Sequence, residues 1–337
     1  MESEIPPRWA TPLLLPFVPA YAAAVAWRNR RYDRLQGVAR LDPAVISVGN
    51  LVMGGTGKTP VCRWLVEAVQ SSGMRAGIAM RGYRASETGV SDEAAEYAME
   101  MPDVPLAIGP DRVASIRALD PMPDCIVLDD GFQHRRVHRD LDVVLVDASR
   151  TGLDRPMLPA GPRRESLGAL RRADAVIITR ASGTDPSLSD TIAKHHGRPP
   201  IAWTTHRWTG LVEHRGDRRV VLDVEAVAGR PLFGVFGIGN PGAIRQAVLD
   251  AGGDLRGCRI LRDHAAYTPA MISDLVVKAR AAGADAIFTT AKDWVKWVPH
   301  SDRLDGMPVL VPKLRINFLE GEPAFRAMLG EALRLGG

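Results

Sequence analysis

The stretch from Val45 to Thr59 constrains the fold of this chain more than any other part of its sequence. Its first four residues are apolar apart from one serine, which is typical of a short buried strand. A loop from Gly49 to Gly57 follows and contains four glycines. Apolar residues then recur at helical spacing, so we expect a helix to begin near Lys58. The stretch therefore predicts a strand, a glycine-rich loop and a helix in direct succession.

A loop of this kind is suited to bind phosphate. Glycines let backbone N–H groups turn toward an anion, and the helix N-terminus adds partial positive charge. Lys58 can reach the β- and γ-phosphates of a nucleotide, and the Thr59 hydroxyl can bind Mg²⁺. Val52 stands where the usual pattern has its first glycine, and neighbouring glycines can replace it. We expect a nucleotide site rather than a purely structural turn, formed by Val52, Met53, Gly54, Gly55, Thr56, Gly57, Lys58 and Thr59.

Length and composition set the class of protein. A chain of 337 residues with 46% hydrophobic and 24% charged residues is expected to be globular, with two domains as a first estimate. The net charge of +4 is mild and suits nucleotides or acidic lipids as well as it suits nucleic acid. The three cysteines are scattered, which predicts no disulfide framework and no zinc site and favours a reducing compartment.

The N-terminal segment is apolar and is followed by arginines. Residues 9–27 carry tryptophans at both ends and prolines in the first half, and four arginines follow within residues 28–34. Acidic residues precede the apolar run, whereas a secretory signal carries positive charge there. The pattern favours a helix that lies at a membrane interface. A membrane-spanning helix and a helix packed on the rest of the protein are the alternatives, and in each case the arginines favour a cytoplasmic location for the remaining chain.

The remaining sequence alternates between short apolar strands and amphipathic helices. This order predicts an α/β fold with mostly parallel sheets and helices on both faces. Residues 199–231 contain strand-like segments and a turn but no clear helix. We therefore expect an N-terminal membrane-associated helix (1–34), a phosphate-loop NTPase-like domain (35–198), a β-ribbon linker (199–231) and a smaller Rossmann-like α/β domain (232–337).

Polar residues follow several predicted strands, at the carboxyl ends where open α/β sheets bind ligands. The apolar run 125–128 ends in Asp129 and Asp130. In phosphate-loop enzymes a carboxylate at such a strand end binds Mg²⁺, directly or through water. An ordinary Asp-Asp-Gly turn is the alternative, and the phosphate loop upstream favours metal binding. Successive side chains of a strand point to opposite faces, so the two aspartates need not have the same role.

Other polar residues at strand ends are weaker signals when each is taken alone. Gln133 and His134 follow the two aspartates and precede two arginines, and they could equally form a solvated basic turn. Asp263 and His264 follow a predicted strand of the second domain. Histidine can transfer protons near neutral pH, but one Asp-His pair identifies no reaction.

Taken in order, these segments resemble the motifs of the tetraacyldisaccharide 4′-kinase family, and the resemblance extends over residues 6–330. The matching segments are Ser47-Val48-Gly49-Asn50-Leu51, Gly54-Gly55-Thr56-Gly57-Lys58-Thr59-Pro60, Arg81-Gly82-Tyr83, Ser91-Asp92-Glu93, Asp129-Asp130-Gly131-Phe132-Gln133-His134, Leu158-Pro159-Ala160-Gly161-Pro162-Arg163-Arg164, Gly237-Ile238-Gly239-Asn240-Pro241, Asp263-His264 and Thr290-Ala291-Lys292-Asp293.

The resemblance implies transfer of the γ-phosphate of ATP, with Mg²⁺ as a cofactor, to the 4′-hydroxyl of an acylated glucosamine disaccharide 1-phosphate, which yields lipid IVA. It implies an active site between the two α/β domains and attachment to the cytoplasmic face of the inner membrane through the N-terminal helix. By motif, Asp92 and His264 form the pair that activates the hydroxyl, and Asp129 or Asp130 engages Mg²⁺, with Lys58 also catalytic. The residues expected to bind substrate are Arg81, Gln133, His134, Arg163 and Asn240.

Three positions depart from the family pattern. Ala265 stands where a second histidine is usual, and Ala291 stands where a glutamate is usual. Both alanines lie in the second α/β domain and affect only the details of the site that the resemblance implies there. Ala94 replaces a usual proline and leaves the Asp92 carboxylate intact.

Other functions remain open at this point. A phosphate-loop ATPase that acts as a membrane-associated switch would hydrolyse ATP without a lipid acceptor, whereas a kinase requires one. A non-catalytic membrane adaptor is less consistent with intact Lys58, Thr59 and aspartates. Nucleic-acid binding is the least consistent, because the basic residues are dispersed and lack interleaved aromatic residues. The sequence implies no protein partner.

Overall fold

A computed structural model describes residues 10–82, 91–262 and 265–335 of the chain. Its α-helices are α1 (Thr11–Leu14), α2 (Val18–Asp33), α3 (Lys58–Ser71), α4 (Asp92–Glu100), α5 (Arg112–Arg117), α6 (Pro186–His196), α7 (Pro241–Asp250), α8 (Pro269–Ala281), α9 (Ala291–Trp297) and α10 (Glu322–Leu335). Short 3₁₀ helices are η2 (Leu15–Phe17), η3 (Leu167–Arg172), η4 (Val224–Val227) and η5 (Val298–Leu304).

The strands form one mixed sheet. They are β1 (Ala44–Asn50), β2 (Ala76–Met80), β3 (Leu106–Ile108), β4 (Cys125–Asp129), β5 (Leu141–Asp147), β6 (Ala175–Thr179), β7 (Ala202–Arg215), β8 (Arg218–Leu222), β9 (Pro231–Phe236), β10 (Asp254–Ile260), β11 (Ala286–Phe288) and β12 (Val309–Glu320). Their order is β10-β9-β11-β12-β7-β6-β5-β1-β4-β2-β3, and β8 pairs with β7. The pairs of β7 with β12 and with β8 are antiparallel and the others are parallel. The predicted α/β fold with a mostly parallel sheet is confirmed.

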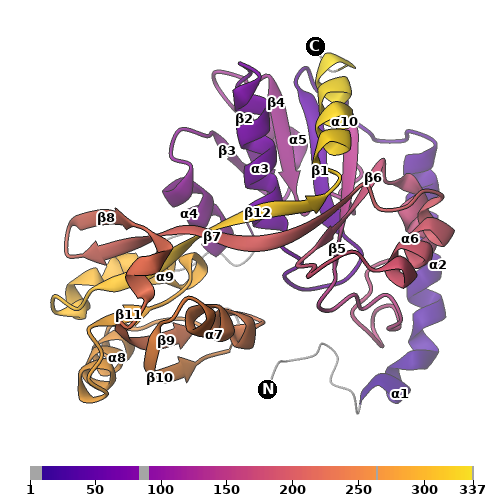
Figure 1. Ribbon diagram of the computed structural model, residues 1–337. Helices are drawn as coiled ribbons and strands as arrows, with labels where there is room; N and C mark the ends of the chain where they lie inside the picture. The colour runs from indigo at the N-terminus through magenta and orange to yellow at the C-terminus, as the bar shows by residue number, and fades with distance from the viewer. Residues whose placement is uncertain (1–9, 83–90, 263–264, 336–337) are drawn as a thin grey trace.

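Figure 1 shows that the chain forms two units, joined by the long strands β7 and β12. The first unit contains β1–β6 with their helices, and the second contains β9–β11 with α7–α9. In the first unit β1 lies between β4 and β5. Val48 of β1 is paired with Asp129 of β4, so the loop after β1 and the end of β4 meet at one edge of the sheet. This edge is where open α/β sheets bind their ligands.

Helices cover both faces of the first unit, which explains why its central strands are mostly apolar and fully buried. On one face Ile46 of β1 packs in a cluster with Cys62 of α3 and Tyr97 of α4. On the other face Val144 of β5 packs in a cluster with Ile192 of α6. The strands that carry the phosphate loop and the aspartates are therefore held in a fully buried layer.

The connection between the units differs from the expected ribbon of residues 199–231. β12 pairs with β7 from Val309 opposite His214 to Glu320 opposite Trp203, so it runs back from the second unit into the first. α10 then packs on the first unit, where Phe325 is fully buried and stacks on Trp64 at 5.2 Å. The apolar face of α10 is thus covered by the first unit, although this helix follows the second unit in sequence.

The second unit has its own core and also touches the first unit. Trp297 of α9 and Ile272 of α8 are fully buried in a cluster on one face of its strands. Met99 of α4 packs against the same cluster. α4 of the first unit therefore lies against α9 of the second, which brings residues of both units to one interface.

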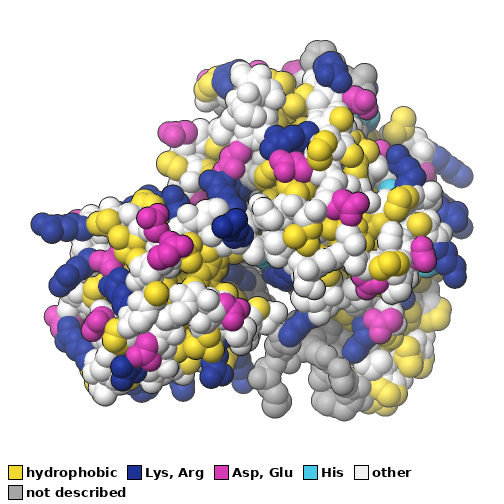
Figure 2. Space-filling view, viewed as in Figure 1, with side chains coloured by type: hydrophobic (Ala, Val, Ile, Leu, Met, Phe, Trp, Pro, Cys, Tyr) yellow, Lys and Arg dark blue, Asp and Glu magenta, His cyan; other side chains and the backbone are white. Residues whose placement is uncertain are grey.

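The N-terminal helices lie along the side of the first unit (Figure 1). Their large apolar side chains are exposed, with Leu13 at 68%, Phe17 at 60% and Trp27 at 64% of full accessibility. Within residues 10–82, 91–262 and 265–335, no helix combines the length and apolar character needed to cross a bilayer. Figure 2 shows basic and acidic side chains interspersed over both units on the face that it displays.

Candidate active site

The phosphate loop has the predicted strand before it and the predicted helix after it. β1 is buried along its whole length, and α3 begins at Lys58. Gly57 caps this helix with a φ of 79°, in the left-handed region that favours glycine. A Cβ atom at Gly57 would also lie 2.9 Å from Nε2 of His206 on β7. Both the backbone angle and the close approach of β7 therefore require glycine here.

Side chains at the carboxyl ends of β1 and β6 hold the loop in shape. Asn50 donates a hydrogen bond of 2.8 Å from Nδ2 to Oγ1 of Thr56, and Thr179 donates one of 2.8 Å to the carbonyl oxygen of Thr56. Arg180 donates to the carbonyl oxygen of Gly55 at 2.5 Å and is also paired with Asp147. These contacts come from the protein itself, so they fix the backbone of the loop at Gly55 and Thr56.

The first part of the loop is paired with a later segment of the chain. Met53 N donates to Pro162 O at 2.9 Å, and Arg164 N donates to Leu51 O at 2.7 Å. Val52 and Arg163 form an antiparallel bridge between them. The position where the usual pattern has a glycine is thus part of a small β-pair here, which accounts for the valine. The guanidinium of Arg163, predicted to bind substrate, donates to the carbonyl oxygen of Arg155.

Asp130 lies between two cations at the mouth of the loop. Its Oδ1 is 3.5 Å from Nζ of Lys58, and both of its carboxylate oxygens accept hydrogen bonds of 2.8 Å from Nη1 of Arg164. Arg164 also donates to Oε1 of Gln133, whose Nε2 donates to the carbonyl oxygen of Asn50. Burial raises the pKa of Asp130, but Lys58 and Arg164 outweigh burial and hold that pKa below its ordinary value.

Asp129 has a different environment, as the alternation of a strand predicts. Its side chain is buried, and Oδ2 accepts a hydrogen bond of 3.0 Å from the hydroxyl of Tyr97. Oδ1 is buried and, among the described residues, has no hydrogen-bond partner. Burial raises the pKa of Asp129 to about 6, although the charge of Lys58 opposes this rise. Asp129 therefore presents an unsatisfied carboxylate oxygen beside the loop.

Asp92 is the first residue of α4, and Ser91 caps this helix by accepting from Ala94 N. Oδ2 of Asp92 lies 3.0 Å from Nζ of Lys296 on α9. Burial raises the pKa of the neighbouring Glu93, although the charge of Lys58 in the phosphate loop opposes this rise. Asp263 and His264 lie outside the described residues, so the pairing of Asp92 with His264 remains a prediction.

Three further residues were predicted to bind substrate. Arg81 follows β2 and acts electrostatically on Arg112, whose pKa is lowered chiefly by burial. His134 is part-buried, and burial together with the Arg112 charge lowers its pKa to about 4, so its imidazole is neutral at pH 7. Asn240 lies in the second unit, where its side chain caps α7 by accepting from Ala243 N at 3.2 Å. Arg81 and His134 thus share the surroundings of Arg112, whereas Asn240 has a local structural contact.

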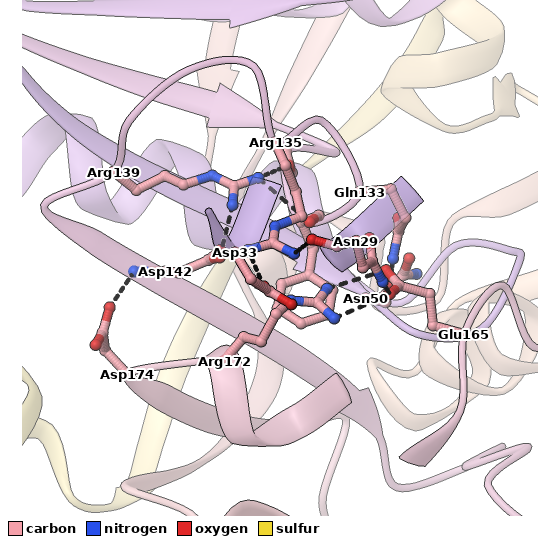
Figure 3. A network of polar contacts seen from close by, with 12 residues as sticks. Asn29, Asp33, Asn50, Gln133, Arg135, Arg139, Asp142, Glu165, Arg172 and Asp174 are labelled. Atoms are coloured by element: carbon pink, nitrogen blue, oxygen red, sulfur yellow. Dashed lines mark hydrogen bonds and ion pairs between the residues drawn. The ribbon is translucent and has the colours of Figure 1, made fainter. Parts of the chain in front are cut away.

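A polar network ties α2 to the residue that follows Arg164 (Figure 3). Glu165 is 1% exposed, and Arg172 donates one hydrogen bond to each of its carboxylate oxygens, at 3.0 and 3.1 Å. Asn29 of α2 donates to the same carboxylate at 2.6 Å, and its backbone carbonyl accepts from Arg135 at 3.1 Å. The N-terminal helix is therefore attached directly beside the phosphate loop.

Some residues of this site were not identified from the sequence as site residues. Arg164 was part of a matching motif but was not assigned a role, and Tyr97 gave no signal because it is a helix residue far from Asp129 in sequence. Arg180 directly follows β6, and the sequence indicates it as one of the polar residues at the carboxyl ends of strands, without a specific role. Lys296 lies four residues after Lys292, one helical turn further along α9, and only the tertiary contact reveals its partner.

As a whole, the site can bind a nucleotide phosphate chain and a divalent cation. The phosphate loop supplies backbone N–H donors and the ammonium group of Lys58. Asp129 and Asp130 supply carboxylate oxygens, and Thr59 supplies a hydroxyl in the first turn of α3. Phosphoryl transfer depends mainly on such positioning and charge stabilisation.

Comparison with known proteins agrees with this chemistry. A family model described as tetraacyldisaccharide-1-P 4′-kinase matches residues 10–334. A tetraacyldisaccharide 4′-kinase of Geobacter sulfurreducens is 35% identical over 329 residues, which cover 91% of this chain and 90% of that protein. A protein of the same name from Anaeromyxobacter dehalogenans is 33% identical over 341 residues, covering 94% and 89%. The crystal structure of LpxK from Aquifex aeolicus in complex with ATP is similar with a TM-score of 0.72 at 25% identity, covering 96% of this chain and 99% of that one.

Proposed function

The chain belongs to the tetraacyldisaccharide-1-P 4′-kinase family. On this basis we propose a role in phosphate transfer for each residue of the site. The chain is an ATP-dependent kinase that phosphorylates the 4′-hydroxyl of tetraacyldisaccharide 1-phosphate in lipid A biosynthesis. The family match over nearly the whole length favours this reaction over a membrane-associated ATPase switch. The observation that carries the assignment of roles is the contact of Lys58 with Asp130 at the mouth of the phosphate loop.

The phosphate loop and Lys58 bind the β- and γ-phosphates of ATP. The loop is already fixed by Asn50, Thr179 and Arg180, so little conformational freedom is lost when ATP binds. Lys58 then stabilises the charge that spreads over the transferring phosphoryl group. Removal of one such group typically costs about 10²–10³-fold in rate.

The carboxylates beside the loop suit Mg²⁺, which prefers oxygen ligands. Oδ1 of Asp129 is buried and has no hydrogen-bond partner in the described part of the chain, which is expected of an oxygen atom that coordinates a ligand. Thr59, Asp129 and Asp130 would hold the ion, with Asp130 released in part from Lys58 when ATP arrives. Bound Mg²⁺ supplies charge neutralisation at the phosphates.

Asp92 and His264 activate the 4′-hydroxyl in this proposal. A sugar hydroxyl is a weak nucleophile, and a positioned base typically contributes ~10²–10⁴-fold. The carboxylate of Asp92 lies at the interface of the two units, where an acceptor between the units can be reached. Arg81, Gln133, His134, Arg163 and Asn240 bind or frame the acceptor. Gln133 also supports the phosphate loop, because its Nε2 donates to the carbonyl oxygen of Asn50. The Arg163 guanidinium supports the neighbouring segment, because it donates to the carbonyl oxygen of Arg155.

The N-terminal helices attach the enzyme to the membrane that contains its lipid substrate. Leu13, Phe17 and Trp27 are exposed, and α2 is fixed beside Arg164 through Glu165. This arrangement would hold the phosphate loop close to the bilayer surface, at the cytoplasmic face of the inner membrane. Exposed apolar side chains next to arginines are typical of interfacial helices.

One experiment separates the kinase from an ATPase switch. ADP release should be measured with Mg²⁺ and ATP, with and without tetraacyldisaccharide 1-phosphate in mixed micelles. The kinase assignment predicts ADP release that depends on the acceptor and stops when Mg²⁺ is chelated. Equal ADP release with and without the acceptor would support the switch instead.

A further inference from the structure

Lys296 joins the two units at the residue proposed to activate the acceptor. Its Nζ lies 3.0 Å from Oδ2 of Asp92 on α4 and donates a hydrogen bond of 3.3 Å to the carbonyl oxygen of Ala265. Lys296 is 10% exposed and the Asp92 side chain 19%, so the pair is largely removed from water. Lys296 therefore contacts the proposed base and the residue that directly follows the Asp-His segment.

Helix packing alone does not require a charge at this interface. Met99 of α4 already packs against the apolar core of the second unit, which joins α4 to α9 without ions. Replacing a buried ion pair by apolar residues is often neutral or stabilising, because desolvation offsets the attraction of the charges. The presence of a largely buried lysine at Asp92 thus points to a role beyond stability.

The surroundings of Asp92 also stabilise the negative charge of its carboxylate. Asp92 lies at the N-terminus of α4, where the helix favours negative charge. One turn before Lys296, Lys292 acts electrostatically on Glu93 and Glu96 of α4, whose pKa values are raised by burial and lowered by this lysine. Lys292 and Lys296 of α9 are thus two cations that act on the acidic residues of α4, although the buried Asp293 of α9 also acts on Glu96 with the opposite sign.

We propose that Lys296 is a positioning residue that holds the Asp92 carboxylate, and the chain segment at Ala265, in the geometry needed to activate the acceptor hydroxyl. This inference rests on the proposed function, in which Asp92 is part of the base. Because Lys296 belongs to the second unit and Asp92 to the first, the base is correctly oriented only when α9 lies against α4. Docking of the two units is then a condition for catalysis and not only for acceptor binding.

The test measures kcat and KM for both substrates in the full-length enzyme. Lys296→Met keeps the length of the side chain and removes its charge. It should lower kcat at least tenfold and by as much as ~10²-fold, the cost of misplacing a reacting group by about 1 Å. The KM for ATP should change by less than about threefold, because the phosphate loop belongs to the first unit. Lys296→Arg, which can contact both oxygens, should recover most of the lost kcat.

A double variant and a matched control make the test specific. Asp92→Asn with Lys296→Met should be no more than about threefold worse than Asp92→Asn alone, because residues that act as a unit are not additive. Lys278→Met removes an exposed lysine of the same unit, paired with Asp274 on α8, and should leave kcat unchanged. Melting temperatures of all variants show whether a loss of activity is a loss of fold.

The outcomes are distinguishable. Normal kcat in Lys296→Met, or a loss that Lys296→Arg does not recover, would overturn the positioning role while Asp92 remained the base. A double variant whose losses multiply would overturn it as well. If Asp92→Asn itself is fully active, the base assignment of the proposed function is wrong and the role of Lys296 falls with it.

Discussion

Nζ of Lys58 lies 3.5 Å from Oδ1 of Asp130, across the point where the loop after β1 meets the end of β4. Arg164 contacts the same carboxylate from a third segment of the chain. One carboxylate thus lies between two cations, each of which is also suited to bind phosphate oxygens. We expect the phosphates of ATP to compete with Asp130 for Lys58, because both groups are anionic, and Asp130 would then have a carboxylate oxygen available for a cation.

Replacement of Lys58 by alanine tests this part of the account. We expect kcat to fall by about 10²–10³-fold or more, because a positive charge at the transferring phosphoryl group is lost. The fold should persist, since Asp130 keeps its two hydrogen bonds to Arg164. Phosphate transfer and the melting temperature should be measured side by side, with Lys194→Ala on the exposed surface of α6 as the control. A folded Lys58→Ala enzyme of normal activity would exclude the assigned ATP site.

The two aspartates should respond differently to substitution. Asp129→Asn removes the buried carboxylate oxygen that has no partner in the described structure, so the Mg²⁺ concentration for half-maximal activity should rise at least tenfold. Asp130→Asn removes a carboxylate oxygen for Mg²⁺ but also the anion that competes with phosphate for Lys58, so we expect the KM for ATP to rise less than in Asp129→Asn. Titration of activity with Mg²⁺ at fixed ATP measures the first effect. If the Mg²⁺ dependence of activity is unchanged in both variants, Asp129 and Asp130 are not ligands of the metal.

The local parts of the site could be predicted from the sequence, because their signals are contiguous. The helix that starts at Lys58 and the strand that ends at Asp129 lie where the residue pattern indicated, and the loop before Lys58 differs only in that β1 continues to Asn50 instead of ending before Gly49. Each depends on backbone conformation within a few residues, where glycine, β-branched residues and helical spacing act directly.

The long-range parts could not be predicted from local patterns. The return of β12 along β7 into the first unit depends on antiparallel pairing between residues about a hundred positions apart, as for Trp203 and Glu320. No residue pattern within β12 shows which unit will cover α10. The contacts of Tyr97 with Asp129 and of Lys296 with Asp92 likewise join distant segments, and they are set by helix packing.

The histidine behind the phosphate loop should make stability depend on pH. Burial, assisted by the Arg180 charge, lowers the pKa of His206 from its ordinary 6.5 to about 4. The unfolded chain therefore takes up a proton below pH 6.5 that the folded chain does not, and the free energy of unfolding should fall as pH drops from about 6.5 to 4. His206→Gln removes this contribution, which is at most about 3 kcal/mol.

Urea unfolding at several pH values measures the effect of His206. The wild type should lose more stability than His206→Gln between pH 6.5 and 4.5, and His138→Gln on the surface near Asp140 serves as the control. Parallel pH curves for wild type and His206→Gln would show that the imidazole of His206 titrates equally in both states.

The exposed apolar side chains of the N-terminal helices should determine membrane binding. Combined Leu13→Ser, Phe17→Ser and Trp27→Ser should weaken vesicle binding at least tenfold, because burial of each side chain contributes about 1.5–3 kcal/mol. None of the three is buried in the described structure, so the fold should be kept. Flotation with anionic vesicles measures binding, and Val277→Ser, 64% exposed on α8, is the control. Equal flotation of the triple variant would locate the membrane-binding surface elsewhere.

The central claim is that this chain transfers the γ-phosphate of ATP to the 4′-hydroxyl of an acylated disaccharide. The most direct measurement follows γ-labelled ATP with tetraacyldisaccharide 1-phosphate, wild-type enzyme and Mg²⁺, and then locates the new phosphate by mass spectrometry and NMR. We expect one labelled phosphate per lipid, at the 4′-oxygen, and almost none with Lys58→Ala. Label released only as inorganic phosphate, or phosphate attached at another oxygen, would contradict it.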